Sequence, residues 1–267
     1  MFGIKHTEKK VFTRNFLTEV SSKFTFPENV KCSYQRNDFI KNLNNSYPNV
    51  SDVAAQEIKL SPLNGQGQSV SVDTNDDKHQ IILMTNDAKR KIVLNNESLM
   101  CSDSIETYSS SEAYDKNLIK VVSNTSMFDI KEFKTFELRK LNLIGFTVKA
   151  KENGKIVVPE ALCQVVSKDL LANYVNIGGV TPYCQRNLYE LKLVDEDYEL
   201  NIKYGVIIDE KNKALTEGSG KVVVDLVVKK TSVTEKKDVE SILHKFHEIL
   251  FDAFCWCVSD EFKKILG

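Results

Sequence analysis

HKFHEILFDAFCWC, from His244 to Cys257, is the stretch that decides how the C-terminal part of the chain folds. It holds two histidines, two cysteines and the only tryptophan of the sequence. These residue types suggest a metal or redox site, whereas their spacing is typical of a helix. At about 100° per residue, the apolar side chains fill one wide arc of a helical wheel and the polar ones a narrow arc. The pattern therefore predicts a long amphipathic helix that starts near Asp238 and is a main element of the core.

The two arcs of this predicted helix have distinct members. The apolar arc contains Ile242, Leu243, Phe246, Ile249, Leu250, Phe251, Ala253, Phe254, Trp256, Cys257 and Val258. The polar arc contains His244, Lys245, Glu248, Asp252 and Cys255. His247 lies inside the apolar arc, so we expect a histidine packed in the core with one hydrogen bond.

Helical geometry argues against a metal site in this stretch. Cys255 and Cys257 point about 160° apart on one helix, so a single ion cannot bind both thiolates. His244 and Cys255 share a direction, but about 16 Å of helical rise separates them. Zinc ligands lie within about 2.3 Å of the metal. C-x-C also differs from the C-x-x-C of redox helices, and no basic neighbour lowers either thiol pKa. We expect no metal and no cofactor.

The segments before this helix read mostly as strands. Phe136 to Lys151 alternates as a long strand, and Asn153-Gly154 is a strong hairpin signal because a type I′ turn needs positive φ at both central residues. A helix is predicted from Pro159 to Ala172. The remaining predicted strands of this part are Arg186–Val194, Tyr198–Asp209 and Lys221–Lys229.

The N-terminal part predicts a similar order. A strand from Val11 to Phe26 precedes a helix from Tyr34 to Leu43, and a loop with Gly65 and Gly67 follows. The last predicted helix, Glu112–Val122, is capped in the region of Ser109 to Ser111. The predicted strands are residues 69–73, 80–86, 91–95 and 98–102.

The order of elements predicts an α+β fold of two similar halves, residues 1–127 and 128–267, packed intimately together. Each half is expected to be an antiparallel sheet covered by helices. The links between strands are short, whereas parallel pairs need long crossovers. The predicted duplication rests on topology, because the halves share no residue-level identity.

Composition narrows the class of partner. The 267 residues include 36 basic and 37 acidic side chains, for a net charge of −1, which does not favour nucleic acid. The N-terminal MFGIKHTEKK has no apolar signal region, and no stretch approaches the roughly 18 apolar residues of a membrane span. Six cysteines without framework spacing indicate reduced thiols. We expect a cytoplasmic protein that does not bind membranes.

Three motifs suggest chemistry. GSGK, from Gly218 to Lys221, lacks the first glycine and the final Ser or Thr of a phosphate-binding loop, and we interpret it as a hairpin turn. NIGGVTP, residues 176–182, lacks the third glycine of a dinucleotide loop. Glu190-Leu191-Lys192 matches the E-x-K half of a metal-dependent nuclease core, with Asp169 as a distant partner. Because alternate strand residues share a face, that geometry is permissible.

Several segments resemble a sporadically distributed prokaryotic family of proteins of uncharacterised function. They are FLTEVSSKFTFPENV and FIKNLNNSYPNVSD near the start, VLNNESL in the middle, LRKLNLIGFTVKA, and ESILHKFHEILFDAFCWCVSDEFKKIL at the end. Tyr47-Pro48 matches a Tyr-Pro pair of that family, whereas its arginine-glycine and arginine-tyrosine-asparagine signature is missing. The resemblance covers most of the chain and implies an α+β fold with two similar halves. It implies no established activity and no catalytic residue.

The function expected from the sequence is non-catalytic recognition of a protein or peptide partner. One alternative is a small-ligand-binding module with a pocket between sheet and helix. The other is a metal-dependent nuclease that uses Asp169, Glu190 and Lys192. A deep apolar pocket would favour the first alternative, and a divalent ion at Glu190 would favour the second.

Overall fold

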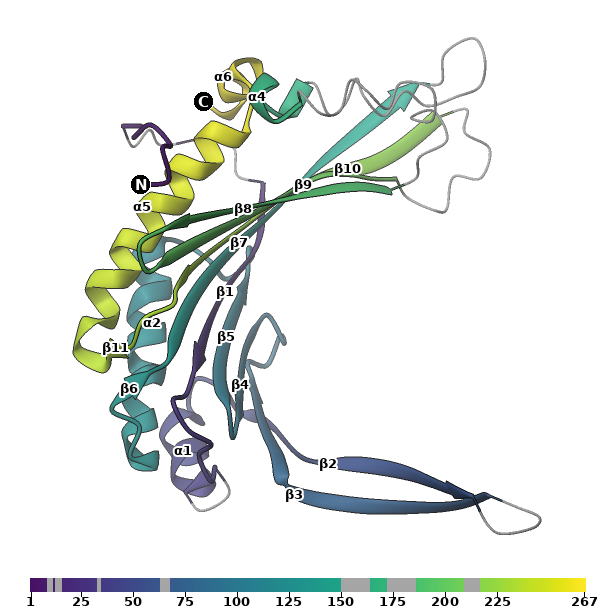
Figure 1. The fold of residues 1–267 in the computed structure, drawn as a ribbon, viewed down its shortest axis with the longest axis vertical. Coiled ribbons are helices and arrows are strands. Elements are labelled where there is room, and N and C mark those ends of the chain that lie inside the picture. The colour runs from purple at the N-terminus through teal and green to yellow at the C-terminus, as the bar shows by residue number, and fades with distance from the viewer. Residues whose placement is uncertain are drawn as a thin grey trace. The chain divides into compact units, whose positions relative to one another are not determined.

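The chain divides into two units whose segments interleave in the sequence (Figure 1). Unit 1 consists of residues 1–20, 137–231 and 241–267, and unit 2 of residues 21–136 and 232–240. The computed structural model describes residues 1–8, 12, 16–32, 35–62, 68–149, 164–171, 186–208 and 217–267. These units partition the chain differently from the predicted halves 1–127 and 128–267, and that predicted boundary stays a prediction.

Unit 1 is an antiparallel sheet with helices. Its strand order is β1-β7-β10-β9-β8, in which β1 and β7 also extend into unit 2. The strands are β1 (Leu17–Thr25), β7 (Thr135–Lys149), β8 (Arg186–Asp195), β9 (Tyr198–Ile208) and β10 (Glu217–Lys230). The helices are α4 (Lys168–Leu171), α5 (Val239–Cys257), which begins in unit 2, and α6 (Asp260–Leu266). The predicted α+β class and antiparallel pairing are confirmed.

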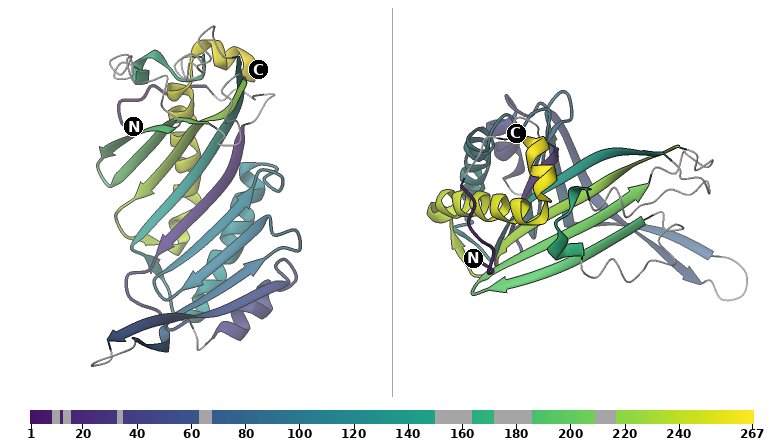
Figure 2. Two further views of the ribbon diagram at one scale, coloured as in Figure 1. Left: turned by 90° about the vertical axis from the view of Figure 1, so that its right-hand side faces the viewer. Right: turned by 90° about the horizontal axis from the view of Figure 1, so that it is seen from above.

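The predicted long C-terminal helix is also confirmed. α5 lies along one face of the unit 1 sheet (Figure 2), as the wide apolar arc requires. The Phe246 ring is fully buried and meets the Tyr198 ring edge-on, with ring centroids 6.2 Å apart. Residues Leu200, Ile202, Tyr204 and Val206 of β9 and Val222, Val224, Leu226 and Val228 of β10 are buried at alternate positions. The alternation follows from the two-residue period of a strand.

Cys255, which the helical wheel assigns to the polar arc, is buried. The N-terminal segment packs over that side of α5 and excludes water from it. The backbone N–H of Thr7 donates to Asp252 Oδ1 at 2.9 Å, and His6 Nδ1 lies 3.1 Å from Asp252 Oδ2. A helical wheel cannot show a distant segment that covers a polar arc.

The helix predicted from Pro159 to Ala172 is interrupted in its described part. Val166 forms an isolated antiparallel bridge with Val258, and α4 covers only Lys168–Leu171. The Ser167 N–H donates to the Cys257 carbonyl, and the Ser259 N–H donates to the Val165 carbonyl. These bonds to the last residue of α5 and to Ser259 replace helical bonds, which explains the break.

Unit 2 contains an antiparallel sheet of order β2-β3-β4-β5-β1. Its strands are β2 (Asn49–Pro62), β3 (Gln68–Met84), β4 (Arg90–Asn95) and β5 (Ser98–Ser104), together with the end of β1. Its helices are α1 (Arg36–Leu43) and α2 (Ser111–Asn124), followed by the 3-10 turn η1 (Thr125–Phe128). A small pair of strands, β6 (Glu132–Phe133) and β11 (Thr234–Glu235), leads to the turn η4 (Lys236–Asp238).

Helix α2 begins where the sequence predicts. The Ser110 hydroxyl accepts a hydrogen bond from the Ala113 N–H at 3.1 Å, which satisfies one of the free amides of the first turn. Tyr114, Leu118, Val121 and Val122 are its buried side chains. Their spacing matches one helical face, so α2 covers one face of this sheet (Figure 2).

Two predictions of local structure are wrong. The segment before Gly65 is not a loop but strand β2, and β3 is one strand of 17 residues where two short ones were predicted. Gly218 to Lys221 is not a hairpin turn, because it belongs to β10, with Gly220 opposite Ile208. Strand pairing over many residues outweighs the weak β-propensity of these polar and glycine-rich segments.

Some predictions fall outside the described residues. These are the turn at Asn153-Gly154, the loop glycines Gly65 and Gly67, and the NIGGVTP segment. The similarity of the two halves stays a prediction. Where the structure is described, it has no helix with the length and hydrophobicity to cross a membrane.

Candidate functional site

The predicted nuclease residues lie on exposed surface of unit 1. Asp169 is exposed on α4, whereas Glu190 and Lys192 are exposed on β8. Glu190 Oε1 lies 3.5 Å from Lys203 Nζ, and Lys192 Nζ lies 2.8 Å from Glu199 Oε1. Both side chains of the E-x-K motif are therefore partners in ion pairs across β8 and β9. No group of three His, Cys, Asp or Glu residues suited to a metal ion occurs among the described residues.

These ion pairs belong to two rows of alternating charge across the unit 1 sheet. Arg139 Nε donates to Asp225 Oδ1 at 2.7 Å and Nη2 donates to Asp225 Oδ2 at 2.9 Å, while Arg139 Nη1 lies 3.7 Å from Glu19 Oε1. Lys203 stands opposite both Asp225 and Glu190 in the strand register. In the second row each strand carries the opposite charge from the one it carries in the first row. The residues of this row are Glu137, Lys229, Glu199 and Lys192. Carboxylates therefore pair with Arg139 and with the lysines of these two rows.

Substitution of the E-x-K residues is expected to have a small effect. Exposed ion pairs contribute about 0–1 kcal/mol, because water and salt screen them. We expect Glu190→Gln to change the free energy of unfolding by less than about 1 kcal/mol and to leave DNA cleavage with Mg²⁺ at background. Cleavage by the parent protein that is lost in Glu190→Gln would contradict this interpretation and restore the nuclease alternative.

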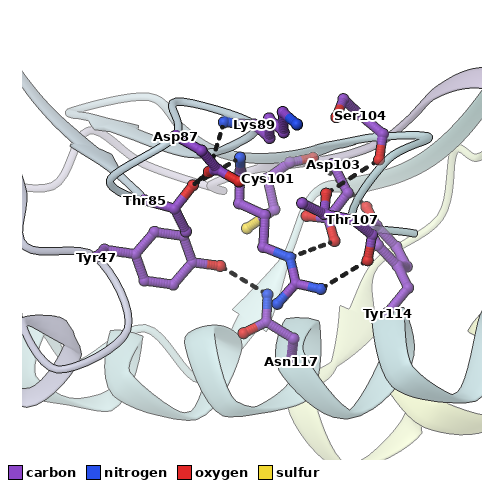
Figure 3. A network of polar contacts seen from close by, with 11 residues as sticks. Tyr47, Thr85, Asp87, Lys89, Cys101, Asp103, Ser104, Thr107, Tyr114 and Asn117 are labelled. Atoms are coloured by element: carbon purple, nitrogen blue, oxygen red, sulfur yellow. Dashed lines mark hydrogen bonds and ion pairs between the residues drawn. The ribbon is translucent and has the colours of Figure 1, made fainter. Parts of the chain in front are cut away.

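A second group of chemically reactive residues is buried in unit 2, between α2 and strands β4 and β5 (Figure 3). The Asp103 side chain is only 3% exposed, and its Oδ2 lies 3.1 Å from Arg90 Nε. Arg90 Nη2 donates to the Thr107 carbonyl at 2.8 Å. The guanidinium therefore bridges the end of β5 and the chain that leads to α2.

Tyrosines connect the helices of this cluster to the sheet. The Tyr114 hydroxyl on α2 donates to Ser22 Oγ at 2.8 Å. One helical turn further along α2, Asn117 Nδ2 donates to the Tyr47 hydroxyl at 2.7 Å. These bonds join α2, β1 and the segment after α1, so the cluster fixes where α2 lies on the sheet.

Burial in this cluster favours the neutral forms of its phenol and thiol groups. Burial raises the pKa of Tyr47 to about 12, and the hydrogen bond from Asn117 opposes the shift. Burial also raises the pKa of the Cys101 thiol and of the Asp103 carboxyl, although Arg90 opposes the latter. A nucleophile or general base works best with a pKa near the working pH. The phenol and thiol shifts run the other way, so we interpret the cluster as structural.

A third feature of interest is a groove in unit 2, which we call the unit 2 groove. It consists of two adjoining hollows of about 700 Å³ and about 380 Å³ that share Asp129, Ile130 and Lys131. The larger hollow is lined by residues 27–31 and 128–132. The smaller one adds Ser126 and residues 235–237.

Hydrogen bonds hold both walls of the unit 2 groove. The loop after β1 is held by the Phe26 and Val30 N–H groups, which donate to the Glu97 and Asn96 carbonyls at 2.8 Å each. On the other side, the Lys236 N–H donates to the Lys131 carbonyl at 3.2 Å. The turn between η1 and β6 has Asp129 at a φ of 57°, a left-handed conformation that Asp tolerates better than most residues.

The floor of the unit 2 groove is apolar and its rim is charged. Val30 and Phe128 are partly buried, and the Ile130 side chain is buried. The Phe128 ring packs 5.7 Å from the Phe39 ring, which fixes its place in the floor. The rim carries carboxylates and ammonium groups in equal number: Glu28, Asp129, Glu132, Glu235, Lys31, Lys131, Lys236 and Lys237.

Lys236 is the distinctive charge of the groove. Its Nζ donates to Ser126 Oγ at 3.0 Å, and no described carboxylate forms an ion pair with it. Burial lowers the pKa of Lys236 to about 8. The adjacent Lys237, in contrast, lies 2.7 Å from Glu235. A partly buried ammonium group without a paired carboxylate favours the binding of an anion beside it.

Sequence reasoning missed both the buried cluster and the groove. In the groove, Lys131 and Lys236 are far apart in the sequence, so no local motif joins them. In the buried cluster, Arg90 and Asp103 are closer, but they also share no motif. The sequence signals near the groove are Pro27, two residues after the end of β1, and Asp129 in the short turn before β6. Each of these predicts only a turn. The comparisons with known proteins add no relative, since no family model matches this chain and no curated protein is significantly similar to it.

Proposed function

We propose that the chain is a non-catalytic binding protein that holds a segment of a protein partner in the unit 2 groove. The observation that carries this proposal is the apolar floor of Val30, Phe128 and Ile130 inside a charged rim. Protein interfaces have this anatomy, in which an apolar centre with aromatic anchors is surrounded by polar residues. Cytoplasmic location and membership of the resembled prokaryotic family remain parts of the proposal.

The charge of the groove supports a peptide rather than a nucleic acid. The rim residues of both signs sum to zero, whereas nucleic-acid sites are strongly basic. The two ends differ, however. The smaller hollow has three lysines against two carboxylates, and the larger hollow has three carboxylates against two lysines. A segment with apolar residues in its middle and an acidic residue toward Lys236 fits both the floor and this polarity.

The proposal predicts a pH dependence for binding of such an acidic segment. The ammonium form of Lys236 binds a carboxylate, and its pKa of about 8 means that the free protein loses this charge in mildly alkaline solution. Bound carboxylate would favour the charged form and raise that pKa again. Affinity should therefore fall as the pH rises through about 8, and Lys236→Met should remove this dependence.

Photo-crosslinking in living cells tests the proposed site. A photoreactive phenylalanine derivative replaces Asn29, an exposed residue of the groove, and in a matched control it replaces Asn45, an exposed residue of unit 2 outside both hollows. We expect a discrete crosslinked protein with Asn29 and none with Asn45. The added substitution Val30→Asp should abolish the crosslink by placing a charge on the floor. Equal crosslinking at both asparagines, or none at either, would contradict the proposed groove.

The nuclease alternative gains no support from the geometry. Glu190 and Lys192 already pair with Lys203 and Glu199, and Asp169 lies on a separate element, α4. The small-ligand alternative requires a pocket between sheet and helix, whereas the small cavity of unit 1 lies between the N-terminal segment and helices α5 and α6.

A further inference from the structure

Unit 1 contains a concave site between the N-terminal segment and helices α5 and α6, which we call the unit 1 cavity. Its volume is about 320 Å³. The side chains that matter for its chemistry are Glu8, Phe12, Phe251, Cys255, Lys263 and Lys264. A volume of this order lies at the lower end of the range of small-molecule pockets, which is about 300–1,000 Å³.

The inner wall of the unit 1 cavity is apolar. The Phe12 ring lies 5.7 Å from the Phe251 ring and 6.3 Å from the Phe254 ring, measured between centroids. Cys255 is only 3% exposed, and burial raises the pKa of its thiol. A neutral buried thiol behaves as a small apolar group. This wall therefore suits the hydrocarbon part of a ligand.

The wall formed by the N-terminal segment is anchored independently of any ligand. The Thr7 N–H donates to Asp252 Oδ1 at 2.9 Å, and His6 Nδ1 lies 3.1 Å from the other carboxylate oxygen. Asp252 belongs to α5, the same helix that supplies Phe251 and Cys255. The cavity is thus largely pre-formed, which lowers the entropic cost of binding.

The charged side chains at the cavity are mainly basic. Lys263 and Lys264 on α6 supply two ammonium groups and Glu8 supplies a carboxylate, and Gly267, the last residue of the sequence, also lines the cavity. Lys263 Nζ lies 2.9 Å from Asp260 Oδ1, so an intrahelical partner engages it in part. Lys264 is exposed and forms no ion pair with a described residue. Lys264 is therefore the ammonium group that is available to a ligand with a single negative charge.

We propose that the unit 1 cavity binds a small aryl carboxylate, a molecule with an apolar ring and one carboxylate group. The ring lies against Phe12 and Phe251 beside the Cys255 thiol. The carboxylate accepts hydrogen bonds from the ammonium groups of Lys264 and Lys263. This site lies in unit 1 and does not depend on the proposed partner groove of unit 2.

The probe for this proposal is 1-naphthoate, with 1-naphthalenemethanol as a neutral molecule of similar shape, and binding is measured by calorimetry on the full chain. We expect 1-naphthoate to bind more tightly than the alcohol. Lys264→Glu should weaken 1-naphthoate by about tenfold or more, because a charge-assisted hydrogen bond is replaced by repulsion. The same substitution should change the affinity of the alcohol by less than about threefold.

Two variants serve as controls. Lys221→Glu makes the same charge change on an exposed residue of β10 that does not line the cavity, and it should leave the affinity for 1-naphthoate unchanged. Phe251→Ala should weaken both probes, because it removes part of the apolar wall. The proposal is overturned if 1-naphthoate does not bind at millimolar concentration, if the alcohol binds equally well, or if Lys264→Glu and Lys221→Glu affect 1-naphthoate equally.

Discussion

Phe246→Ala is expected to lower the free energy of unfolding by about 3–5 kcal/mol, through lost burial of the ring and the cavity left behind. Phe246 is fully buried in the middle of α5 and contacts the Tyr198 ring of β9. A whole domain is stabilised by only about 5–15 kcal/mol, so the loss is a large share of the total. Chemical denaturation followed by far-ultraviolet circular dichroism should show an earlier midpoint, or the protein should be insoluble.

The neighbour Lys245 provides the matched control for this prediction. Its Nζ lies 4.0 Å from the centroid of the Tyr198 ring, so Lys245→Ala removes a cation–π contact worth about 0.5–1 kcal/mol and leaves the core intact. His247→Ala should be intermediate, because that side chain is buried but partly polar. A Phe246→Ala protein that unfolds like the parent would show that α5 does not carry the stability of unit 1.

An element is predictable from the sequence when its signal lies within the element itself, and it is missed when its stability depends on a distant segment. Helix α5 is predictable because an apolar arc of 3.6-residue period appears within the stretch itself. Helix α2 is predictable because a serine cap precedes a similar arc. Strand β2 was missed because polar residues and alanines dominate Asn49 to Pro62, and its main stabilising partner, β3, lies beyond Gly65. Pairing between strands is not visible in either strand alone.

The candidate sites were harder to predict than the elements. Lys236 acquires its significance from Ser126 and from residues 129–131, and Lys264 from the segment at Thr7 and Phe12. In the sequence these are ordinary charges in a chain that is rich in them. The motif that did stand out, Glu190-Leu191-Lys192, is engaged in surface ion pairs. Local patterns predict helices and strands, whereas concave sites depend on contacts between distant segments.

Removal of Arg90 should have the second large effect. Arg90→Met leaves the nearly fully buried Asp103 without its cation, and breaking a buried pair from one side typically costs about 3–5 kcal/mol. We expect about 3 kcal/mol at neutral pH, near the lower limit, because 32% of the Arg90 side chain is exposed and water already screens the pair. Lys89→Met on the same hairpin is the control, since the Lys89–Glu106 pair is exposed and should contribute less than about 1 kcal/mol.

The pH dependence of this loss separates electrostatics from packing. Burial raises the pKa of Asp103, and Arg90 opposes that shift, so without Arg90 the pKa of the carboxyl in the folded state should rise further. A carboxyl whose pKa is raised in the folded state destabilises the fold when it is ionised. This destabilisation is absent below the unfolded-state pKa of about 3.9 and complete above the folded-state pKa. The difference in unfolding free energy between the parent and Arg90→Met should therefore be smallest in acid and increase as the pH rises.

Adding Asp103→Asn should recover much of the loss at neutral pH, because it removes the buried charge. A loss that is the same at every pH, and that Asp103→Asn does not relieve, would mean that Arg90 stabilises unit 2 through packing and its bond to Thr107 alone.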